Sequence, residues 1–279
     1  MSYEEFFGLS MQPFSNVPDD RFYFNSEQHD QALLRLKYAA ETMKGLAVLV
    51  GDLGTGKTTL ARRLLLEMDD SIYETALLII VHPDISSLWL LRKIASQFEL
   101  DQLADTRVEI LNQLFLRLKE IKKQNKKAVV LIDEANMLRA KEIMEELRGL
   151  LNLEDSGQML ITFILFGLPE IDQNLSLDVA LLQRVALKFS LRSLKYESTL
   201  RYIQHRMKIA GAKESVFTDE AYGLIHRAST GIPRLINTIC DNSLLEAFLL
   251  KKSKVDLYIV REVVNDLGLL QTRTSIDSF

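Results

Sequence analysis

The fold is decided by the stretch Gly51-Asp52-Leu53-Gly54-Thr55-Gly56-Lys57-Thr58, which fits the pattern Gly-x-x-x-x-Gly-Lys-Ser/Thr. Its glycines allow a tight backbone loop whose N–H groups point inward at phosphate oxygens. An apolar run at 46–50 precedes the loop, and residues 59–68 follow it with apolar residues at helical spacing. A buried strand, this loop and a helix form the context that phosphate binding requires.

An acidic pair closes a second buried run. Asp133 and Glu134 follow the strand-type residues 128–132. We expect ATP and Mg²⁺ as cofactors, with Lys57 on the β- and γ-phosphates and with Thr58 and Asp133 holding the metal ion. Glu134 is suited to polarise the attacking water, which favours hydrolysis over transfer to a small acceptor. The expected nucleotide-binding residues are Gly51, Asp52, Leu53, Gly54, Thr55, Gly56, Lys57, Thr58, Thr59 and Asp133, of which Asp52 is a turn residue.

Strand and helix patterns alternate as far as residue 193. The expected strands are 46–50, 76–81, 128–132, 160–166 and 185–191, and the expected helices are 28–43, 59–68, 88–98, 108–123 and 141–152. Such alternation implies right-handed crossovers and a parallel sheet with both faces covered. The sequence therefore predicts an α/β fold with a five-stranded parallel sheet.

After residue 193 the pattern is helical throughout. Thr218 is a candidate N-cap, and Pro233 marks the start of another helix. We predict an α/β nucleotide-binding domain at 1–193, a small all-helical domain at 194–270 and a flexible tail at 271–279.

The α/β domain is expected to carry an irregular N-terminal arm without a helix. Its aromatic residues Phe14, Phe22, Tyr23 and Phe24 allow two interpretations: a ring covers the adenine, or the arm packs against the sheet edge.

Composition excludes several classes of protein. The formal net charge of −4 gives no global footprint for nucleic acid. Basic clusters at 62–63, 122–123, 126–127 and 251–252 are interpreted as solvated helix ends. The single cysteine, Cys240, is expected to be a packed thiol in a reducing compartment, and the four histidines lack metal-ligand spacing. The N-terminus lacks a basic region, and no apolar run is long enough for a membrane span, so we expect a cytoplasmic protein.

The segments 51–58 and 129–134 together resemble those of AAA+ ATPases. More narrowly, the chain resembles the ExeA/GspA-type ATPases of bacterial secretion and envelope loci, which are related to the MuB and TnsC transposition ATPases. The supporting segments cover roughly residues 1 to 268 and include Phe7-Gly8-Leu9, Pro13-Phe14, Pro18-Asp19, Glu146-Leu147-Arg148, Gln183-Arg184-Val185 and Gly231-Ile232-Pro233-Arg234.

This resemblance implies roles for arginines. Arg184 matches the arginine that reaches the γ-phosphate of a neighbouring subunit, where it offsets charge in the transition state. Arg148 is a second candidate, although it is placed to pair with Glu145 and Glu146 on the same helix. Arg234 matches the sensor-2 arginine, so the helical domain would be a lid that closes on triphosphate.

One position departs from the family pattern. Leu168 follows the fourth strand, where the resemblance implies a polar sensor-1 residue such as Gln. Thr162 lies earlier in the strand and is expected to be too far away. We therefore expect slow hydrolysis.

The resemblance implies an ATPase that forms a ring or filament and drives assembly or remodelling of a secretion or envelope system. It would act in the cytoplasm, or at the inner membrane through a membrane-associated protein partner. The alternative is an ATP-gated oligomer on DNA that regulates transposition, which stimulation of turnover by duplex DNA would distinguish. A small-molecule kinase is a third possibility, which Glu134 and the helical domain oppose.

Overall fold

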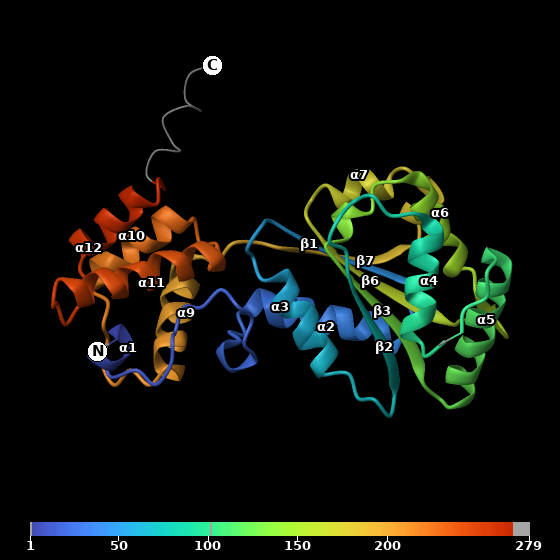
Figure 1. Cartoon of the computed structure of the whole chain (residues 1–279), viewed down its shortest axis with the longest axis horizontal. Helices are drawn as coiled ribbons and strands as arrows, with labels where there is room; N and C mark the ends of the chain where they lie inside the picture. Colours follow the sequence, from blue (N-terminus) through green and yellow to red (C-terminus); the bar gives the residue numbers. More distant parts are fainter. Residues whose placement is uncertain (1, 101, 270–279) are drawn as a thin grey trace, which may run out of the picture. The chain divides into compact units, whose positions relative to one another are not determined.

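The computed structural model describes residues 2–100 and 102–269 (Figure 1). These residues form two compact units. The α/β unit comprises residues 27–53 and 57–191. The helical unit comprises residues 2–26 and 192–269, and the short segment 54–56 groups with it. The predicted tail at 271–279 lies outside the described residues.

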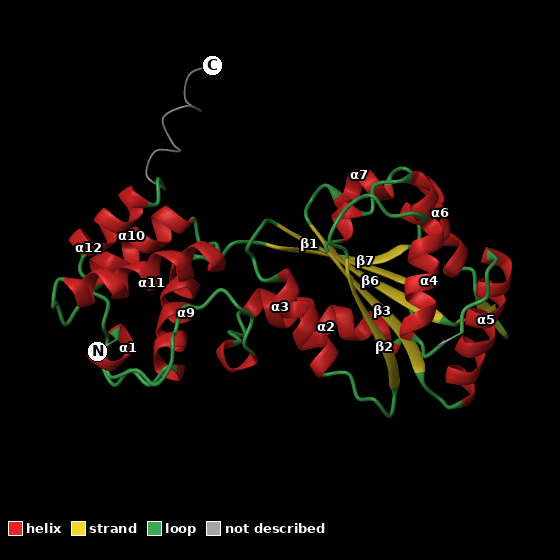
Figure 2. Cartoon of the chain, viewed as in Figure 1, coloured by secondary structure: helices red, strands yellow, loops and turns green. Residues whose placement is uncertain are grey.

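The α/β unit is built on one five-stranded parallel sheet (Figure 2). Its strands are β1 (Leu46–Gly51), β2 (Tyr73–Ile79), β3 (Lys127–Asp133), β6 (Ile161–Gly167) and β7 (Val185–Leu191). Their order in the sheet is β2-β3-β6-β1-β7, and every neighbouring pair is parallel. The predicted fold class and the five predicted strands are therefore confirmed, with ends that differ by a few residues.

Helices cover both faces of this sheet (Figure 1). The helices are α2 (Glu27–Glu41), α3 (Lys57–Leu66), α4 (Ser87–Gln97), α5 (Arg107–Lys123), α6 (Lys141–Leu150), α7 (Ile171–Leu175) and α8 (Val179–Leu182), with the 3₁₀ turn η2 (Ala135–Met137). Helices α4, α5 and α6 share one core with alternate residues of the strands. Helices α2 and α3 contact β1, β3 and β6 on the other face. Strands β1 and β6 are buried along their whole length, which explains their continuous apolar sequences.

Some short elements were not predicted. A hairpin joins β4 (Glu154–Asp155) to β5 (Gln158–Met159), with Ser156 and Gly157 at φ 56° and 74° in its turn. Elements of two to five residues, such as β4, β5, α7 and α8, are too short for a hydrophobic period to show in the sequence.

The helical unit contains α1 (Tyr3–Phe6), η1 (Asp20–Phe22), α9 (Tyr196–Ile209), α10 (Asp219–Ser229), α11 (Pro233–Leu249) and α12 (Leu257–Asp266). The side chain of Thr218 caps α10 by accepting a hydrogen bond from Ala221 N, and Pro233 begins α11. The thiol of Cys240 is buried in this core, as expected. Among the described helices, none is both long enough and apolar enough to cross a membrane.

The N-terminal arm packs into the helical unit. The prediction of an arm without a helix was wrong at its start, where Ser2 and Glu5 form a capping box for the short helix α1. Phe14 is only 2% exposed and packs edge-on against Phe217, with ring centroids 6.0 Å apart. Phe24 packs in the same way against a tyrosine of α9. These rings are therefore held in the core of the helical unit, and neither expected role for the arm describes their contacts.

One buried arginine fastens this arm. Arg206 of α9 is 6% exposed, and its Nε donates to the carbonyl oxygen of Pro13 at 2.6 Å. Its Nη2 donates to the carbonyl oxygen of Ser15 at 3.1 Å, and its guanidinium lies 4.8 Å from the ring centroid of Phe22. A planar group with five donors can satisfy several backbone carbonyls at once. Arg206 therefore replaces the backbone pairing that an irregular segment lacks.

Candidate nucleotide site

The phosphate loop lies between a buried strand and a helix, as the motif requires. Strand β1 ends at Gly51 and helix α3 begins at Lys57. Gly54 and Gly56 have φ of 79° and 104°, a region that side-chain-bearing residues rarely adopt. The loop geometry therefore depends on the two glycines in the middle of the motif.

Lys57 is positioned by the loop itself. Its side chain is buried, and Nζ donates to the carbonyl oxygens of Gly51 at 2.8 Å and Asp52 at 3.0 Å. These contacts hold a positive charge beside the loop. Phosphate oxygens could take over such contacts, because an ammonium group binds phosphate as a compact point charge. Thr58 follows in the first turn of α3 and is half-buried.

The acidic pair lies at the end of β3. Asp133 is 2% exposed, and its Oδ1 accepts a hydrogen bond from Glu134 N at 3.0 Å. Glu134 adopts φ 55° and ψ 35°, which is unusual for a residue with a side chain. Such strained residues concentrate at functional sites, where the surrounding structure holds them. The left-handed conformation ends the extended strand at Glu134.

The sheet order brings the loop and the acidic pair together at the carboxyl-terminal ends of the strands. Strand β6 lies between β1 and β3, with Gly167 opposite Val50 and Leu165 opposite Ile132. Neighbouring strands are about 4.8 Å apart, so the ends of β1 and β3 are separated by about 10 Å. A polyphosphate held at the loop would therefore lie within reach of a metal ion near Asp133.

The end of β6 differs from the family pattern, as expected. Leu168 has an apolar side chain, and its N–H donates to Oδ1 of Asn136 at 3.0 Å. Thr162 lies near the start of β6, where its hydroxyl contacts the sulfur of Met43. It is about 16 Å along the strand from Gly167, too far to reach a nucleotide at the other end.

Asn136 is a buried polar residue beside the acidic pair that the sequence pattern did not single out. It is 3% exposed in the turn η2, directly after the acidic pair. Its carbonyl oxygen accepts a hydrogen bond from Asn174 Nδ2 at 2.8 Å. A Cβ placed on Gly167 would lie 3.1 Å from Asn136 N, so the end of β6 and this turn are in close contact. The available sequence signal was a polar residue within an otherwise apolar turn after Glu134.

The arginine candidates differ in their surroundings. Arg148 does not pair with its helix neighbours as expected, because its Nε donates to Asp178 Oδ2 at 2.7 Å. This contact lowers the pKa of the Asp178 carboxyl. Glu146 instead lies 2.7 Å from Nη2 of Arg107. Arg148 is therefore already engaged within its own chain, which weakens its candidacy.

Arg184 remains available for another molecule. It is exposed in the turn between α8 and β7, and its Nη1 has only a long contact of 3.5 Å to the carbonyl oxygen of Leu151. Arg234 is exposed in the first turn of α11 in the helical unit. Its contact with a nucleotide stays a prediction.

The residues present fit a Mg²⁺ ion bound with a nucleotide. Across residues 2–100 and 102–269, no group of three or more His, Cys, Asp or Glu side chains could hold a metal ion alone. Magnesium is usually held by one or two protein groups together with phosphate oxygens and water. Thr58 and Asp133 would supply such a partial set.

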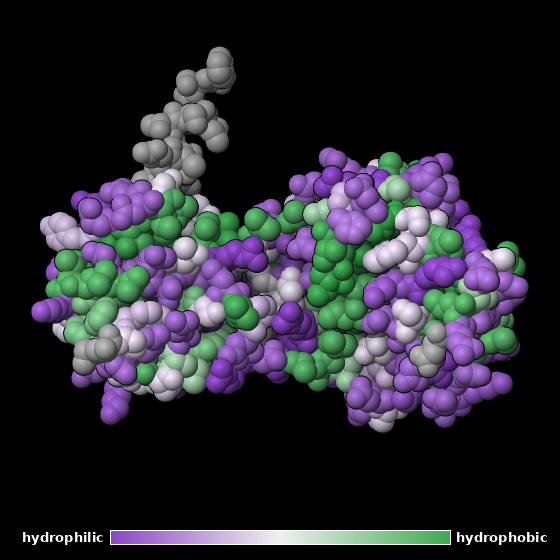
Figure 3. Space-filling model, viewed as in Figure 1, coloured by the Kyte–Doolittle hydropathy of each residue, from purple (hydrophilic) through white to green (hydrophobic). Residues whose placement is uncertain are grey.

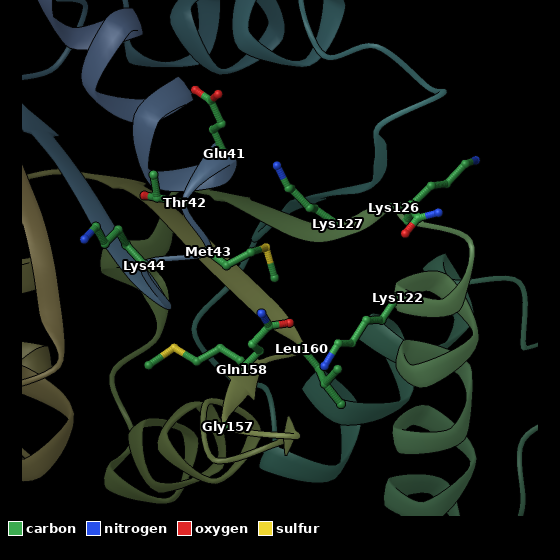
Figure 4. Close-up of a pocket in the computed structure, with 12 residues that line it drawn as sticks. Glu41, Thr42, Met43, Lys44, Lys122, Lys126, Lys127, Gly157, Gln158 and Leu160 are labelled. Atoms are coloured by element: carbon green, nitrogen blue, oxygen red, sulfur yellow. The ribbon is translucent and has the colours of Figure 1, made fainter.

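A separate pocket lies at the amino-terminal ends of the strands, away from the phosphate loop (Figure 4). It has a volume of about 680 Å³ and is lined by the turns before β1, β3 and β6. Lys44, Lys122, Lys126 and Lys127 surround it from different sides. Lys122 and Lys126 are half-buried and pair with Asp155 and Glu74, so these clusters are not simply solvated helix ends.

Comparison with known proteins shows what this chain is similar to. Residues 40–175 match the family described as "AAA domain". General secretion pathway protein A of Aeromonas hydrophila is 36% identical over 256 residues, which cover 91% of this chain and 46% of that relative. An uncharacterized HTH-type transcriptional regulator of Methanocaldococcus jannaschii is 27% identical over 155 residues, or 54% of this chain and 37% of the relative. The chain thus spans less than half the length of either protein.

Solved structures show the same fold. Cdc6p of Pyrobaculum aerophilum has a TM-score of 0.69 at 18% identity, covering 91% of this chain and 70% of that chain. The ADP form of ORC2 from Aeropyrum pernix has a TM-score of 0.62 at 16% identity, covering 88% and 72%. The RuvB branch migration motor of Thermotoga maritima has a TM-score of 0.59 at 17% identity, covering 92% and 74%.

Residues 40–175 thus match the AAA family, and the whole chain has the P-loop fold of the solved structures to which it is similar. Its similarity to General secretion pathway protein A confirms the resemblance to the ExeA/GspA type that its motifs indicated.

Proposed function

We propose that this protein binds ATP with Mg²⁺ at the loop Gly51–Thr58 and hydrolyses the γ-phosphate bond. One observation carries this proposal: the loop, buried Asp133 and left-handed Glu134 meet at the carboxyl-terminal ends of the strands. Lys57 would neutralise phosphate charge, and Thr58 and Asp133 would hold the ion, which spreads the charge that develops on the phosphoryl group. Glu134 would orient the attacking water and accept its proton.

Replacing Glu134 by Gln tests the proposed base. The amide keeps the size and hydrogen-bonding reach of the side chain but cannot accept a proton. We expect ATP affinity to stay within a few-fold and phosphate release to fall by about 10²-fold or more. Glu142→Gln removes an exposed carboxylate from α6 and serves as the control. Wild-type turnover in Glu134→Gln would show that the base is another group.

Hydrolysis is proposed to occur between subunits of a ring or filament, with Arg184 acting on a neighbour's nucleotide. Arg184 is exposed next to three apolar side chains that also face solvent, Leu177, Val179 and Leu182, with exposed fractions of 42%, 63% and 40%. Exposed apolar groups that cluster in this way are typical of interaction surfaces. The surface of α8 therefore supports a contact with a second copy of the chain.

A second apolar surface supports a head-to-tail arrangement. Ile79 and Val81 are exposed at and just after the end of edge strand β2, and Trp89 is exposed in the first turn of α4. Figure 3 shows apolar side chains gathered on this side of the α/β unit. Strand β7, which follows Arg184, forms the other edge of the sheet. Two different surfaces at opposite edges are what a heterologous contact requires.

Mixing two inactive variants tests the shared site. Arg184→Ala should keep ATP binding and lose turnover, whereas Lys57→Ala should lose binding. In an equimolar mixture, about a quarter of the interfaces would combine an intact loop with an intact arginine, so about a quarter of wild-type turnover should return. Mixing Arg184→Ala with the double variant Lys57→Ala/Arg184→Ala is the control, because it contains no intact interface. Absence of rescue would argue against an arginine supplied by a neighbour.

The energy of hydrolysis is proposed to drive assembly or remodelling of a bacterial secretion or envelope component. The similarity to General secretion pathway protein A supports this role. In this proposal the protein works on the cytoplasmic side, through a protein partner that is membrane-associated or belongs to the secretion system.

A second candidate is an ATP-gated oligomer that binds DNA and regulates transposition. Lysines around the pocket at the amino-terminal ends of the strands favour it, although Lys122 and Lys126 are paired with Asp155 and Glu74. A structural relative, ORC1 of Aeropyrum pernix, has been solved in complex with DNA, with a TM-score of 0.61 at 14% identity. The net charge of −4 opposes it. Stimulation of ATP hydrolysis by duplex DNA, with a steep salt dependence, would favour this function, and indifference to DNA would remove it.

A further inference from the structure

We infer that Asn136 is a catalytic residue that donates, through its Nδ2, the hydrogen bond to the γ-phosphate that Leu168 cannot supply. This inference rests on the proposed function. It assigns the hydrogen bond to the γ-phosphate to the turn after the acidic pair, because the end of β6 has no polar side chain to donate it.

The position of Asn136 is suited to this task. Its side chain reaches from the end of β3 to the end of β6, where Oδ1 accepts the hydrogen bond from Leu168 N at 3.0 Å. Strand β6 is the strand between the phosphate loop and Asp133. The amide of Asn136 therefore lies at the end of β6, between the phosphate loop expected to hold ATP and Asp133, which is expected to hold Mg²⁺.

The hydrogen bonds also fix the orientation of the amide. Because Oδ1 accepts from a backbone N–H, the opposite corner of the amide must be the donor Nδ2. The backbone of Asn136 is held in turn by Asn174, whose Nδ2 donates to its carbonyl oxygen. The donor is thus presented by a rigid turn that is tied to both β6 and α7.

The donor itself has no protein partner. Among the described residues, no acceptor contacts Asn136 Nδ2, and this atom is not one of their fully buried unpartnered atoms. The residue is nevertheless only 3% exposed. Because Nδ2 is not fully buried, it can donate to water in the free protein and to an anionic acceptor in place of that water. A phosphate oxygen bound at the ends of β3 and β6 would be such an acceptor for Nδ2.

The substitution Asn136→Asp separates this donor from a structural role. Aspartate keeps an oxygen for Leu168 N but removes the donor. We expect the thermal midpoint to change little and phosphate release to fall by about 10²-fold or more, because the donor is lost and the new carboxylate also repels the phosphate and weakens ATP binding. Asn174→Ala is the matched control, because it loosens the turn and leaves the Asn136 amide intact. Its midpoint should fall, and its turnover should fall less than that of Asn136→Asp, because the donor is loosened but still present.

A second-site rescue covers the case in which Asn136→Asp fails to fold. Asn136→Ala should be slow, and the double variant Asn136→Ala/Leu168→Gln should recover at least about tenfold of the lost turnover, because the new amide lies at the end of the same strand. Full turnover in folded Asn136→Asp, or no recovery in the double variant, would overturn the inference. If Glu134→Gln abolishes hydrolysis in the same assay, such a failure concerns Asn136 alone and the proposed function stands.

Discussion

Lys57→Ala is expected to abolish ATP binding, with an affinity at least about 100-fold below that of the wild type in calorimetry with Mg²⁺. The reason is that Lys57 supplies a buried positive charge next to the loop, and truncating one partner of a buried charged contact usually costs 2–5 kcal/mol or more. In the free protein this ammonium donates to the carbonyl oxygens of Gly51 and Asp52 within the loop itself. Its removal should therefore leave the fold intact.

Two measurements make this result specific. Arg62→Ala removes an exposed cation from the same helix and should bind ATP as the wild type does. Circular dichroism and thermal unfolding should show that Lys57→Ala is folded, since alanine favours the helix. A folded Lys57→Ala that binds ATP with normal affinity would mean that the nucleotide is held elsewhere.

The sheet could be predicted because its strands are buried on both faces. Such strands appear in the sequence as continuous apolar runs, as in β1 and β6, which are buried throughout. Strand β2 was predicted to begin at residue 76, but it begins at Tyr73. Its first three residues are only half-buried, so they lack the apolar character that marks the centre of the sheet.

The candidate site was predictable where its residues are neighbours in sequence. The phosphate loop and the pair Asp133-Glu134 are each contiguous, and their placement at one edge follows from a parallel sheet. Asn136 was missed because its contacts are with Leu168 and Asn174, which lie 32 and 38 residues away.

The partner of Arg148 differs from the one that helix spacing predicts. Spacing on the helix favoured the nearby Glu145 and Glu146, whereas the structure pairs Arg148 with Asp178, 30 residues along the chain. Asp178 also accepts a hydrogen bond from Leu181 N at the start of α8. Pairing preferences on an isolated helix are worth only about 0.2–0.5 kcal/mol, so a tertiary partner with better geometry prevails.

The same limit explains why the contacts of the N-terminal arm could not be predicted. Arg206 and Pro13 are separated by 193 residues, and nothing in the local sequence of α9 marks one arginine as buried. Arg206 also donates from Nη1 to Tyr202 Oη at 2.8 Å, within the same helix. Its charge is thus satisfied by carbonyl, hydroxyl and aromatic groups.

Arg206→Met is expected to destabilise the helical unit by about 3 kcal/mol and to release the arm. Methionine fills much of the volume, but it leaves the carbonyl oxygens of Pro13 and Ser15 without their donors, and hydrogen bonds to a charged group are worth about 1.5–3 kcal/mol each. Part of this loss is offset, because the folded protein no longer buries a charge. Thermal unfolding and limited proteolysis near residue 17 would measure the two effects.

The comparison with neighbouring variants separates anchoring of the arm from a general effect on α9. Arg201→Met replaces an exposed arginine of the same helix and should change stability by less than about 0.5 kcal/mol. Arg206→Lys keeps the charge but loses the planar fork, so it should fall between Arg206→Met and the wild type. If Arg206→Met left the arm as resistant to protease as in the wild type, the ring contacts of Phe14 and Phe24 would be sufficient to hold it. The hydrogen bonds of the Arg206 guanidinium would then not be needed to hold the arm in place.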